Sequence, residues 1–140
     1  MYNNMPLTEE MKRWNKMIEE EMQKTSDIKY LDNFSIEVQE LYEELKKIIF
    51  GLYPNTKIEV KKNYISFKAK TIFLDVQPQQ RILKGVINIR KSKLKHSPKI
   101  LRDISKVGHF GSGDYEFSIT SIEDIKKVMN FINQSYKINS

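Results

Sequence analysis

The spacing of the apolar residues changes twice along this chain, and these changes constrain the fold more than any other feature. Up to about residue 52 the apolar residues recur every three or four positions, which is typical of amphipathic helices. Between residues 57 and 90 they largely alternate with polar residues, which is typical of β-strands. The helical spacing returns after residue 121. The sequence therefore predicts an α+β fold.

Two helices are predicted in the first third of the chain. Thr8, followed by two glutamates, favours a helix start, and an apolar stripe at helical spacing follows it: Met11, Trp14, Ile18 and Met22. This stripe docks either on the rest of the domain or on a partner subunit. We interpret residues 25–33 as a linker because they are mostly polar. Ser35 is the predicted N-cap of a second helix that ends near Pro54.

The middle of the chain predicts an antiparallel meander, because its strands are joined by short connections. The four predicted strands cover residues 57–61, 64–68, 71–76 and 82–90. Ser97 and Pro98 favour the start of a short helix, a glycine-rich turn covers residues 108–114, and a fifth strand begins at Tyr115. Ser121 caps the predicted last helix.

These elements predict a two-layer domain, with an antiparallel sheet of about five strands and the N- and C-terminal helices packed on it. We expect residues 1–34 to form a helical arm and linker, and residues 35–140 to form the α+β domain. The chain contains no cysteine, which fits a reducing compartment. It shows neither an export signal nor an apolar run that could span a bilayer, so we expect a cytoplasmic protein and no membrane partner.

The positive charge is concentrated in one third of the chain. The formal net charge is +6, but residues 57–106 alone hold fourteen Lys and Arg against three Asp and Glu, a net charge of +11. A field of this kind attracts polyanions such as nucleic acid. A lysine-rich solvated surface explains the same composition, so both interpretations stay open. The candidate nucleic-acid-binding residues are Arg90, Lys91, Lys93, Lys95 and Lys99, with Lys61 and Lys62.

The glycine-rich turn is the second candidate site. Its glycines let backbone N–H groups approach an anion, and neighbouring rings add donors. The candidate ligand-binding residues are Tyr64, His109, Gly111 and Tyr115. A tight connection between β elements uses glycine for its conformation alone, and this alternative also stays open.

Catalytic chemistry receives little support from the sequence. His96 and His109 lack a third ligand at metal spacing, and Glu59 and Lys61 form an E-x-K pair without the upstream strand-borne acid that metal-dependent nucleases use. We assign no catalytic residue, metal or cofactor, and lean against an enzyme.

The chain also resembles a bacterial family whose function is not established. The resemblance covers about residues 41–136, and its most distinctive stretch is Val107-Gly108-His109-Phe110-Gly111-Ser112-Gly113-Asp114-Tyr115-Glu116. An older label for this family is "predicted transport protein". Its members often form the C-terminal part of larger proteins, some of which carry restriction-nuclease-like domains. The resemblance thus implies an accessory module and supplies no catalytic residues.

Together these observations predict a non-catalytic accessory domain that associates with nucleic acid through a basic surface of sheet and loop. The alternative is a module that binds a protein or a small ligand at the Gly108–Tyr115 turn. The apolar stripe near the N-terminus further admits a protein partner or self-association.

Overall fold

The structure is a computed structural model that describes residues 8–94 and 99–140, except for the side chains of residues 20–25. It contains three α-helices, α1 (Glu9–Leu31), α2 (Ile36–Leu52) and α3 (Ile122–Asn139), and a single 3-10 turn, η1 (Lys91–Lys93), in the described residues. The strands are β1 (Lys57–Val60), β2 (Ile65–Lys68), β3 (Ile72–Pro78), β4 (Leu83–Ile87), β5 (Arg102–Asp103) and β6 (Tyr115–Ile119). They form one antiparallel sheet in the order β1-β2-β3-β4-β6-β5. The predicted α+β fold is confirmed, with six strands instead of about five.

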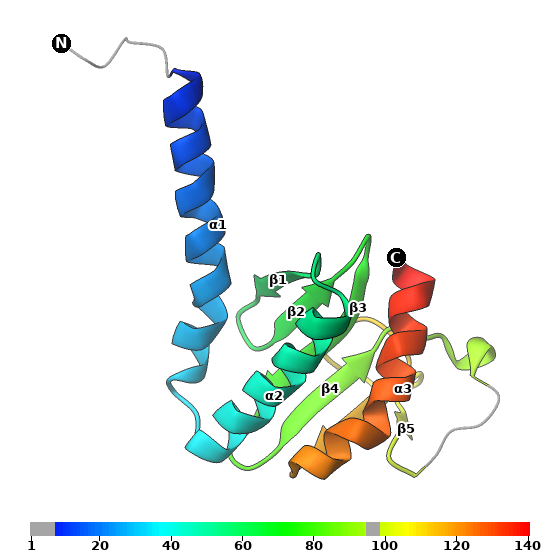
Figure 1. Ribbon diagram of the computed structural model, residues 1–140. Coiled ribbons are helices and arrows are strands. Elements are labelled where there is room, and N and C mark those ends of the chain that lie inside the picture. The colour runs from blue at the N-terminus through cyan, green and yellow to red at the C-terminus, as the bar shows by residue number, and fades with distance from the viewer. Residues whose placement is uncertain (1–7, 95–98) are drawn as a thin grey trace.

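Helices α2 and α3 cover one face of this sheet and create the core (Figure 1). From the sheet side, Phe67 and Phe73 are fully buried and contact each other. From the helix side, Tyr42 packs on Phe67, and Tyr136 packs edge-on against Phe73. The apolar residues of the helices and those of the sheet thus face each other and form the core between the two layers.

Side-chain caps start all three α-helices where the sequence predicts them. The hydroxyls of Thr8, Ser35 and Ser121 accept hydrogen bonds from the N–H groups three residues further on. Such caps satisfy amide groups that have no partner inside the helix.

Helix α1 is longer than predicted, since residues 25–31 of the predicted linker are helical. Asp27 is fully buried there, and its carboxylate accepts hydrogen bonds from the Tyr42 hydroxyl at 2.6 Å and the Lys46 ammonium at 2.7 Å. Burial raises the pKa of Tyr42, and the neighbouring carboxylate adds to the effect. This buried network, together with buried Leu31, holds the C-terminal end of α1 on the domain. The linker that the polar composition of this segment predicted is therefore wrong for residues 25–31.

The N-terminal half of α1 behaves differently and extends away from the rest of the molecule (Figure 1). Every residue from Thr8 to Glu19 is exposed. Met11, Trp14 and Ile18 of the predicted apolar stripe are therefore not docked on the domain, and Trp14 is 63% exposed. The side chain of Met22 lies outside the described part of the structure. Within the described residues, none of the helices has the length and apolar composition that a bilayer crossing requires.

A second correction concerns the segment after η1. The sequence predicts a short helix after Ser97 and Pro98, but residues 102–103 form strand β5, which pairs with β6. The proposed cap at Ser97 and Pro98 lies outside the described residues. Here the pairing with β6 decides the structure, although the apolar spacing of this segment fits a short helix equally well.

Candidate functional site

The candidate site begins with the sheet face that α2 and α3 leave uncovered. Strand register places six residues in one row across this face: Glu59, Ser66, Asp75, Val86, Glu116 and Arg102. Five of the six are polar or charged, whereas the neighbouring row, which includes Phe67, Leu74 and Ile87, faces the helices. The sheet therefore has an apolar side and a polar side.

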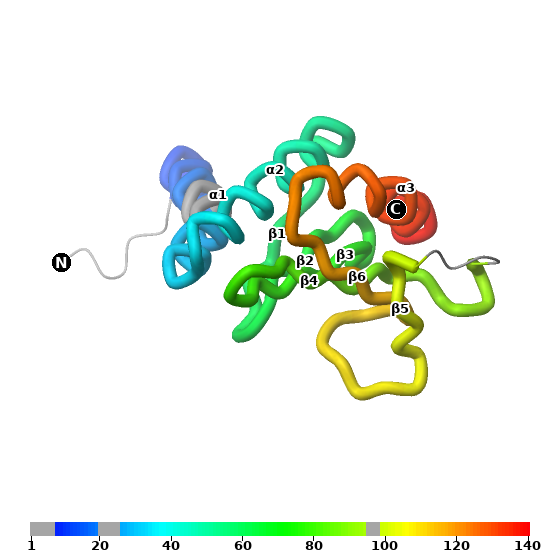
Figure 2. Tube along the Cα trace, turned by 90° about the horizontal axis from the view of Figure 1, so that it is seen from below, coloured from blue at the N-terminus to red at the C-terminus, as the bar shows by residue number. Residues whose placement is uncertain are grey.

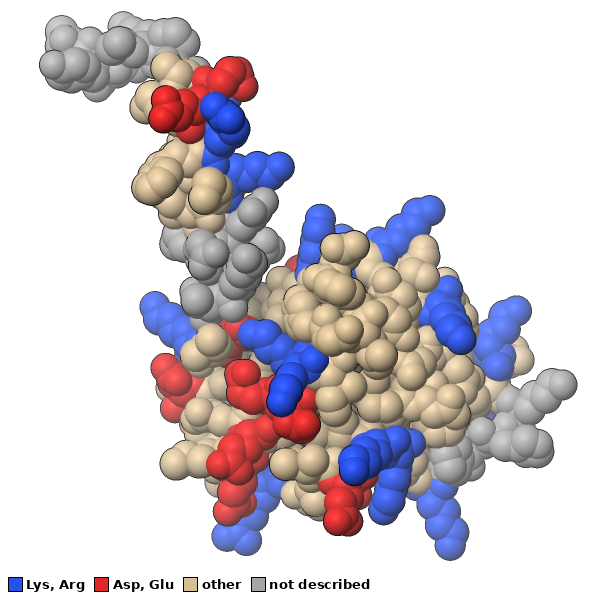
Figure 3. Space-filling view, viewed as in Figure 1, with Lys and Arg blue, Asp and Glu red and all other residues tan. Residues whose placement is uncertain are grey.

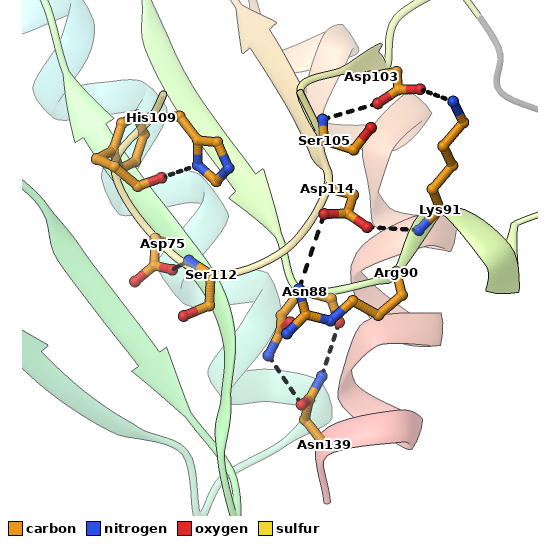
Figure 4. A network of polar contacts seen from close by, with 11 residues as sticks. Asp75, Asn88, Arg90, Lys91, Asp103, Ser105, His109, Ser112, Asp114 and Asn139 are labelled. Atoms are coloured by element: carbon orange, nitrogen blue, oxygen red, sulfur yellow. Dashed lines mark hydrogen bonds and ion pairs between the residues drawn. The ribbon is translucent and has the colours of Figure 1, made fainter. Parts of the chain in front are cut away.

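A loop of residues 104–114 folds over the polar side of the sheet (Figure 2). Phe110 at its tip packs on Tyr64, with ring centroids 5.4 Å apart. The Ser112 N–H donates to Asp75 Oδ2 at 2.9 Å (Figure 4). Gly111 and Gly113 have φ values of 73° and 115°, which side chains other than glycine rarely adopt. The glycines thus let this connection lie directly on the sheet.

Asp75 is the most unusual residue under this loop, because its charged group is only 1% exposed. Its carboxylate accepts a short hydrogen bond of 2.5 Å from the Ser66 hydroxyl, in addition to the bond from Ser112. Burial raises the pKa of Asp75 above its usual value, although both hydrogen bonds oppose that change. Asp75 therefore ties the loop to the middle of the sheet, and its partners are all internal to the chain.

Carboxylates on either side of Asp75 hold the cations of the polar side. Glu59 lies 3.0 Å from Lys61 Nζ and 3.6 Å from Lys68 Nζ, and the hydrogen bond from Lys61 lowers the pKa of Glu59. Glu116 lies 3.7 Å from Lys84 Nζ and 3.8 Å from an Arg102 nitrogen. These ion pairs neutralise much of the positive charge on the sheet itself.

The β5 edge of the sheet has a different arrangement, in which exposed cations lie over less exposed carboxylates. The side chains of Arg90 and Arg102 are 71% and 65% exposed, while their partners Asp114 and Glu116 are only 18% and 10% exposed. Lys91 Nζ lies 3.0 Å from Asp103, as Figure 4 shows. At Arg90 and Arg102 the cationic groups therefore face solvent, while the acids that position them lie behind.

Local hydrogen bonds fix this edge to the glycine-rich loop. The Lys91 N–H donates to Asp114 Oδ2 at 2.8 Å, where the loop enters β6. Hydrogen bonds from Ser105 and Lys91 lower the pKa of Asp103 to about 2, so this acid stays ionised in neutral solution. The loop and the cations of the β5 edge are thus parts of one connected region (Figure 4).

The predicted nucleic-acid-binding residues are divided between two edges. Arg90, Lys91, Lys93 and Lys99 lie in the connection from β4 to β5, whereas Lys95 lies outside the described residues. Lys61 and Lys62 lie in the β1–β2 hairpin at the opposite edge. Five strand spacings, about 24 Å in all, separate the two edge strands. On the helix side, acidic side chains gather toward the lower left of Figure 3, with lysines and arginines around them.

The predicted ligand-binding residues also lie in two different places. Tyr64 packs on Phe110, which precedes Gly111 in the loop. His109 of the same loop is exposed, with Nδ1 2.6 Å from the Phe110 carbonyl oxygen. Tyr115 is only 3% exposed and belongs to the core on the helix side. Sequence reasoning missed Asp75 as a site residue; its signal was a single acid between the apolar residues Leu74 and Val76 of a buried strand.

Metal-binding and E-x-K chemistry find no further support in the geometry. The described residues include no cluster of three or more His, Asp or Glu side chains suited to a metal ion. Glu59 and Lys61 of the E-x-K pair bind each other.

Comparison with known proteins identifies a relative and a family, and the descriptions of both name no activity. A protein of Haemophilus influenzae, described as uncharacterized, is 37% identical over 100 residues, which is 71% of this chain and 33% of that protein. The chain therefore spans about a third of the length of this relative. No solved structure matches the chain. The family model described as "Domain of unknown function (DUF5655)" matches residues 27–139. That match begins at buried Asp27 and covers most of the chain, so the chain belongs to the DUF5655 family.

Proposed function

We propose that this chain is a non-catalytic accessory domain that associates with nucleic acid through a basic edge at β5. The basic edge consists of Arg90, Lys91, Lys93, Lys99, Arg102 and Lys106. The observation that supports it is the placement of highly exposed cations over acids that are largely buried, as at Arg102 and Glu116. Phosphate oxygens approaching from solvent would meet the cations first.

The anchored cations suit contacts with a phosphate backbone. A long side chain loses conformational entropy when it is fixed on a ligand. Arg90 and Arg102 are already held near Asp114 and Glu116. Their side chains therefore lose less conformational entropy when they bind a phosphate. Lys93, Lys99 and Lys106 are exposed and have no ion pair among the described residues, which leaves them available for phosphate. Such contacts give affinity that depends on salt, with little sequence preference.

The context implied by the family resemblance agrees with this proposal. An accessory domain beside a restriction-nuclease-like domain would help to hold DNA, and its weak sequence preference would leave specificity to its neighbour. The proposal also places the protein in the cytoplasm, where such substrates occur.

The alternative, a ligand-binding module at the glycine-rich turn, has weaker support. The Ser112 N–H, which could have met an anion, already donates to Asp75. Tyr115 is in the core and cannot contribute its hydroxyl to a ligand at the loop. The loop therefore has an evident structural role.

A salt titration with charge-reversed variants tests the proposal. Lys93→Glu combined with Lys99→Glu changes the basic edge without breaking a described ion pair. Lys57→Glu combined with Lys62→Glu makes the same charge change at the opposite edge and is the control. Binding of a labelled duplex is measured by fluorescence anisotropy at several salt concentrations.

We expect the basic-edge variant to weaken binding at least tenfold and to reduce the slope of log K against log salt by about two, because each phosphate contact contributes about 0.9. The control should retain the slope, and its affinity should change by less than about threefold, since long-range attraction alone is screened. Equal losses in the two variants would show attraction by net charge without a defined edge. Absence of binding by the unmodified protein at low salt would reject the function.

A further inference from the structure

The apolar stripe on the projecting half of α1 is the largest feature that the proposed function does not use. Its described members, Met11, Trp14, Met17 and Ile18, are between 43% and 63% exposed. They lie three or four positions apart, with one widening the stripe, so that they share one side of the helix. Large apolar side chains grouped in this way usually mark an interaction surface.

The helix itself also favours a partner. Most of the stability of a helix in a protein comes from packing of its apolar face, and short isolated helices are marginal in water. Residues 8–19 have no buried member. Among the described side chains, they are supported by the Thr8 cap and by an exposed pair between Glu9 and Lys12 at 3.4 Å. An exposed pair of this kind contributes only a few tenths of a kcal/mol. Packing against another surface would supply the missing stabilisation.

The order of charges along α1 indicates which surface that is. Lys12, Arg13 and Lys16 are followed within one turn by Glu19, and the sequence continues with two further acids. In an antiparallel pair of such helices, the basic segment of each copy lies beside the acidic segment of the other. A parallel pair would instead place like charges together, at an energetic cost.

We infer that the projecting half of α1 pairs antiparallel with the same segment of a second copy of this chain. A two-fold axis crossing the helices near Lys16 and Met17 brings Trp14 of one copy beside Ile18 of the other. The same register brings Arg13 of each copy within a helical turn of Glu19 of the other. One surface patch meets itself, as expected for a symmetric dimer.

The geometry of the whole molecule allows this pairing. The α+β body lies beside the C-terminal half of α1, while the N-terminal half extends beyond it (Figures 1 and 3). Antiparallel pairing therefore leaves the two bodies at opposite ends of the paired helices. The overlapping segment is about 27 Å long for 18 residues, so the interface is small and the dimer is expected to dissociate on dilution.

Trp14 provides an internal probe because it is the single tryptophan of the chain. Sedimentation velocity over a range of concentrations should show the mass rising toward twice 16.6 kDa. The Trp14 emission maximum should shift to shorter wavelength over the same range as the ring leaves water. A mass that stays at 16.6 kDa at the highest concentration would overturn the inference, as would emission that is already shifted in the monomer.

Two variants distinguish specific pairing of the helices from nonspecific association through exposed apolar side chains. Trp14→Ala should weaken dimerisation at least tenfold, whereas Ile36→Ala, which changes a side chain that is 72% exposed at the start of α2, should leave it unchanged. Thermal unfolding of each variant checks that the body remains folded.

A charge exchange tests the direction of the pair. A variant that combines Lys12→Glu and Arg13→Glu with Glu19→Lys and Glu20→Lys exchanges the basic and acidic segments. In an antiparallel pair this variant should dimerise with itself as tightly as the unmodified chain does, and a mixture of the two chains should form no mixed dimer. A mixed dimer that forms in preference to both homodimers would overturn the antiparallel pair, because the exchanged segments attract the original ones only when the helices run parallel.

Discussion

The two faces of the sheet are closed by different means. On one face, α2 and α3 bring apolar side chains onto Phe67, Phe73 and their neighbours, so that the closure is simple burial of apolar surface. On the other face, the loop of residues 104–114 closes onto a buried carboxylate, Asp75, through a backbone hydrogen bond. The first closure depends on many interchangeable contacts, whereas the second depends on a few groups with fixed geometry.

The largest expected effect comes from the backbone of the loop. A Cβ on Gly113 would lie 2.1 Å from the Ile87 carbonyl oxygen, and its φ of 115° is unsuited to alanine. Gly113→Ala should lower the free energy of unfolding by about 4 kcal/mol, the sum of roughly equal contributions from backbone strain and from overpacking. Urea denaturation measures the loss.

Gly108→Ala is the matched control, because a Cβ there has no heavy atom within 4 Å. It should change the free energy of unfolding by less than about 1 kcal/mol. Similar losses in the two variants would mean that the loop does not hold Gly113 against β4, and the contrast between the two faces would fail.

A smaller effect is expected on the helix face. Ser135 of α3 is fully buried, and its hydroxyl donates to the Phe73 carbonyl at 2.6 Å. Ser135→Ala leaves that carbonyl without this donor and should cost about 2 kcal/mol, measured by urea denaturation. Ser140→Ala, which removes an exposed hydroxyl beyond the end of the same helix, should cost nothing measurable. Equal stability of both variants would show that apolar packing alone holds α3.

The smallest effect is a pH dependence that distinguishes the carboxylate of the loop face. Because the pKa of Asp75 is raised in the folded state above 3.8, its contribution to stability is fully present below that pH and is lost as the pH rises through the raised pKa. Asp75→Asn retains an acceptor for Ser112 and a donor for Ser66, without the charge. Relative to the unmodified protein, this variant should gain stability as the pH rises from about 4 toward neutral.

Asp103→Asn should show the opposite behaviour and so serves as the control. The pKa of Asp103 is lowered to about 2, so its contribution is present above pH 3.8 and is lost as the pH falls toward 2. Unfolding curves over this pH range measure both variants. A stability difference for Asp75→Asn that stays flat, or that falls with rising pH, would contradict the raised pKa.

Much of the helix face follows from the sequence, because its determinants are local. Thr8, Ser35 and Ser121 mark the helix starts, and the alternation around Phe67 correctly separates it from Tyr64. These features depend on residues within a few positions of one another. Periodicity and capping were therefore sufficient to predict the two layers.

The loop face could not be predicted in the same way, because its contacts join distant residues. Asp75 and Ser112 are 37 positions apart, and no local pattern indicates that they meet. Strand β5 has only two residues, too few to show an alternation, so the apolar spacing around it suggested a helix. At the start of the domain, burial of Asp27 by Tyr42 and Lys46 outweighs the low helix propensity of its segment.

The two borders of the sheet bear on how copies of this chain can meet. The edge strand of a sheet has unpaired backbone N–H and C=O groups, to which strands of other molecules can add. Here β5 offers only Arg102 and Asp103, both charged, and α1 runs alongside β1 at the other border. Neither border is a good template for continued strand addition, which agrees with the closed, symmetric dimer that we infer.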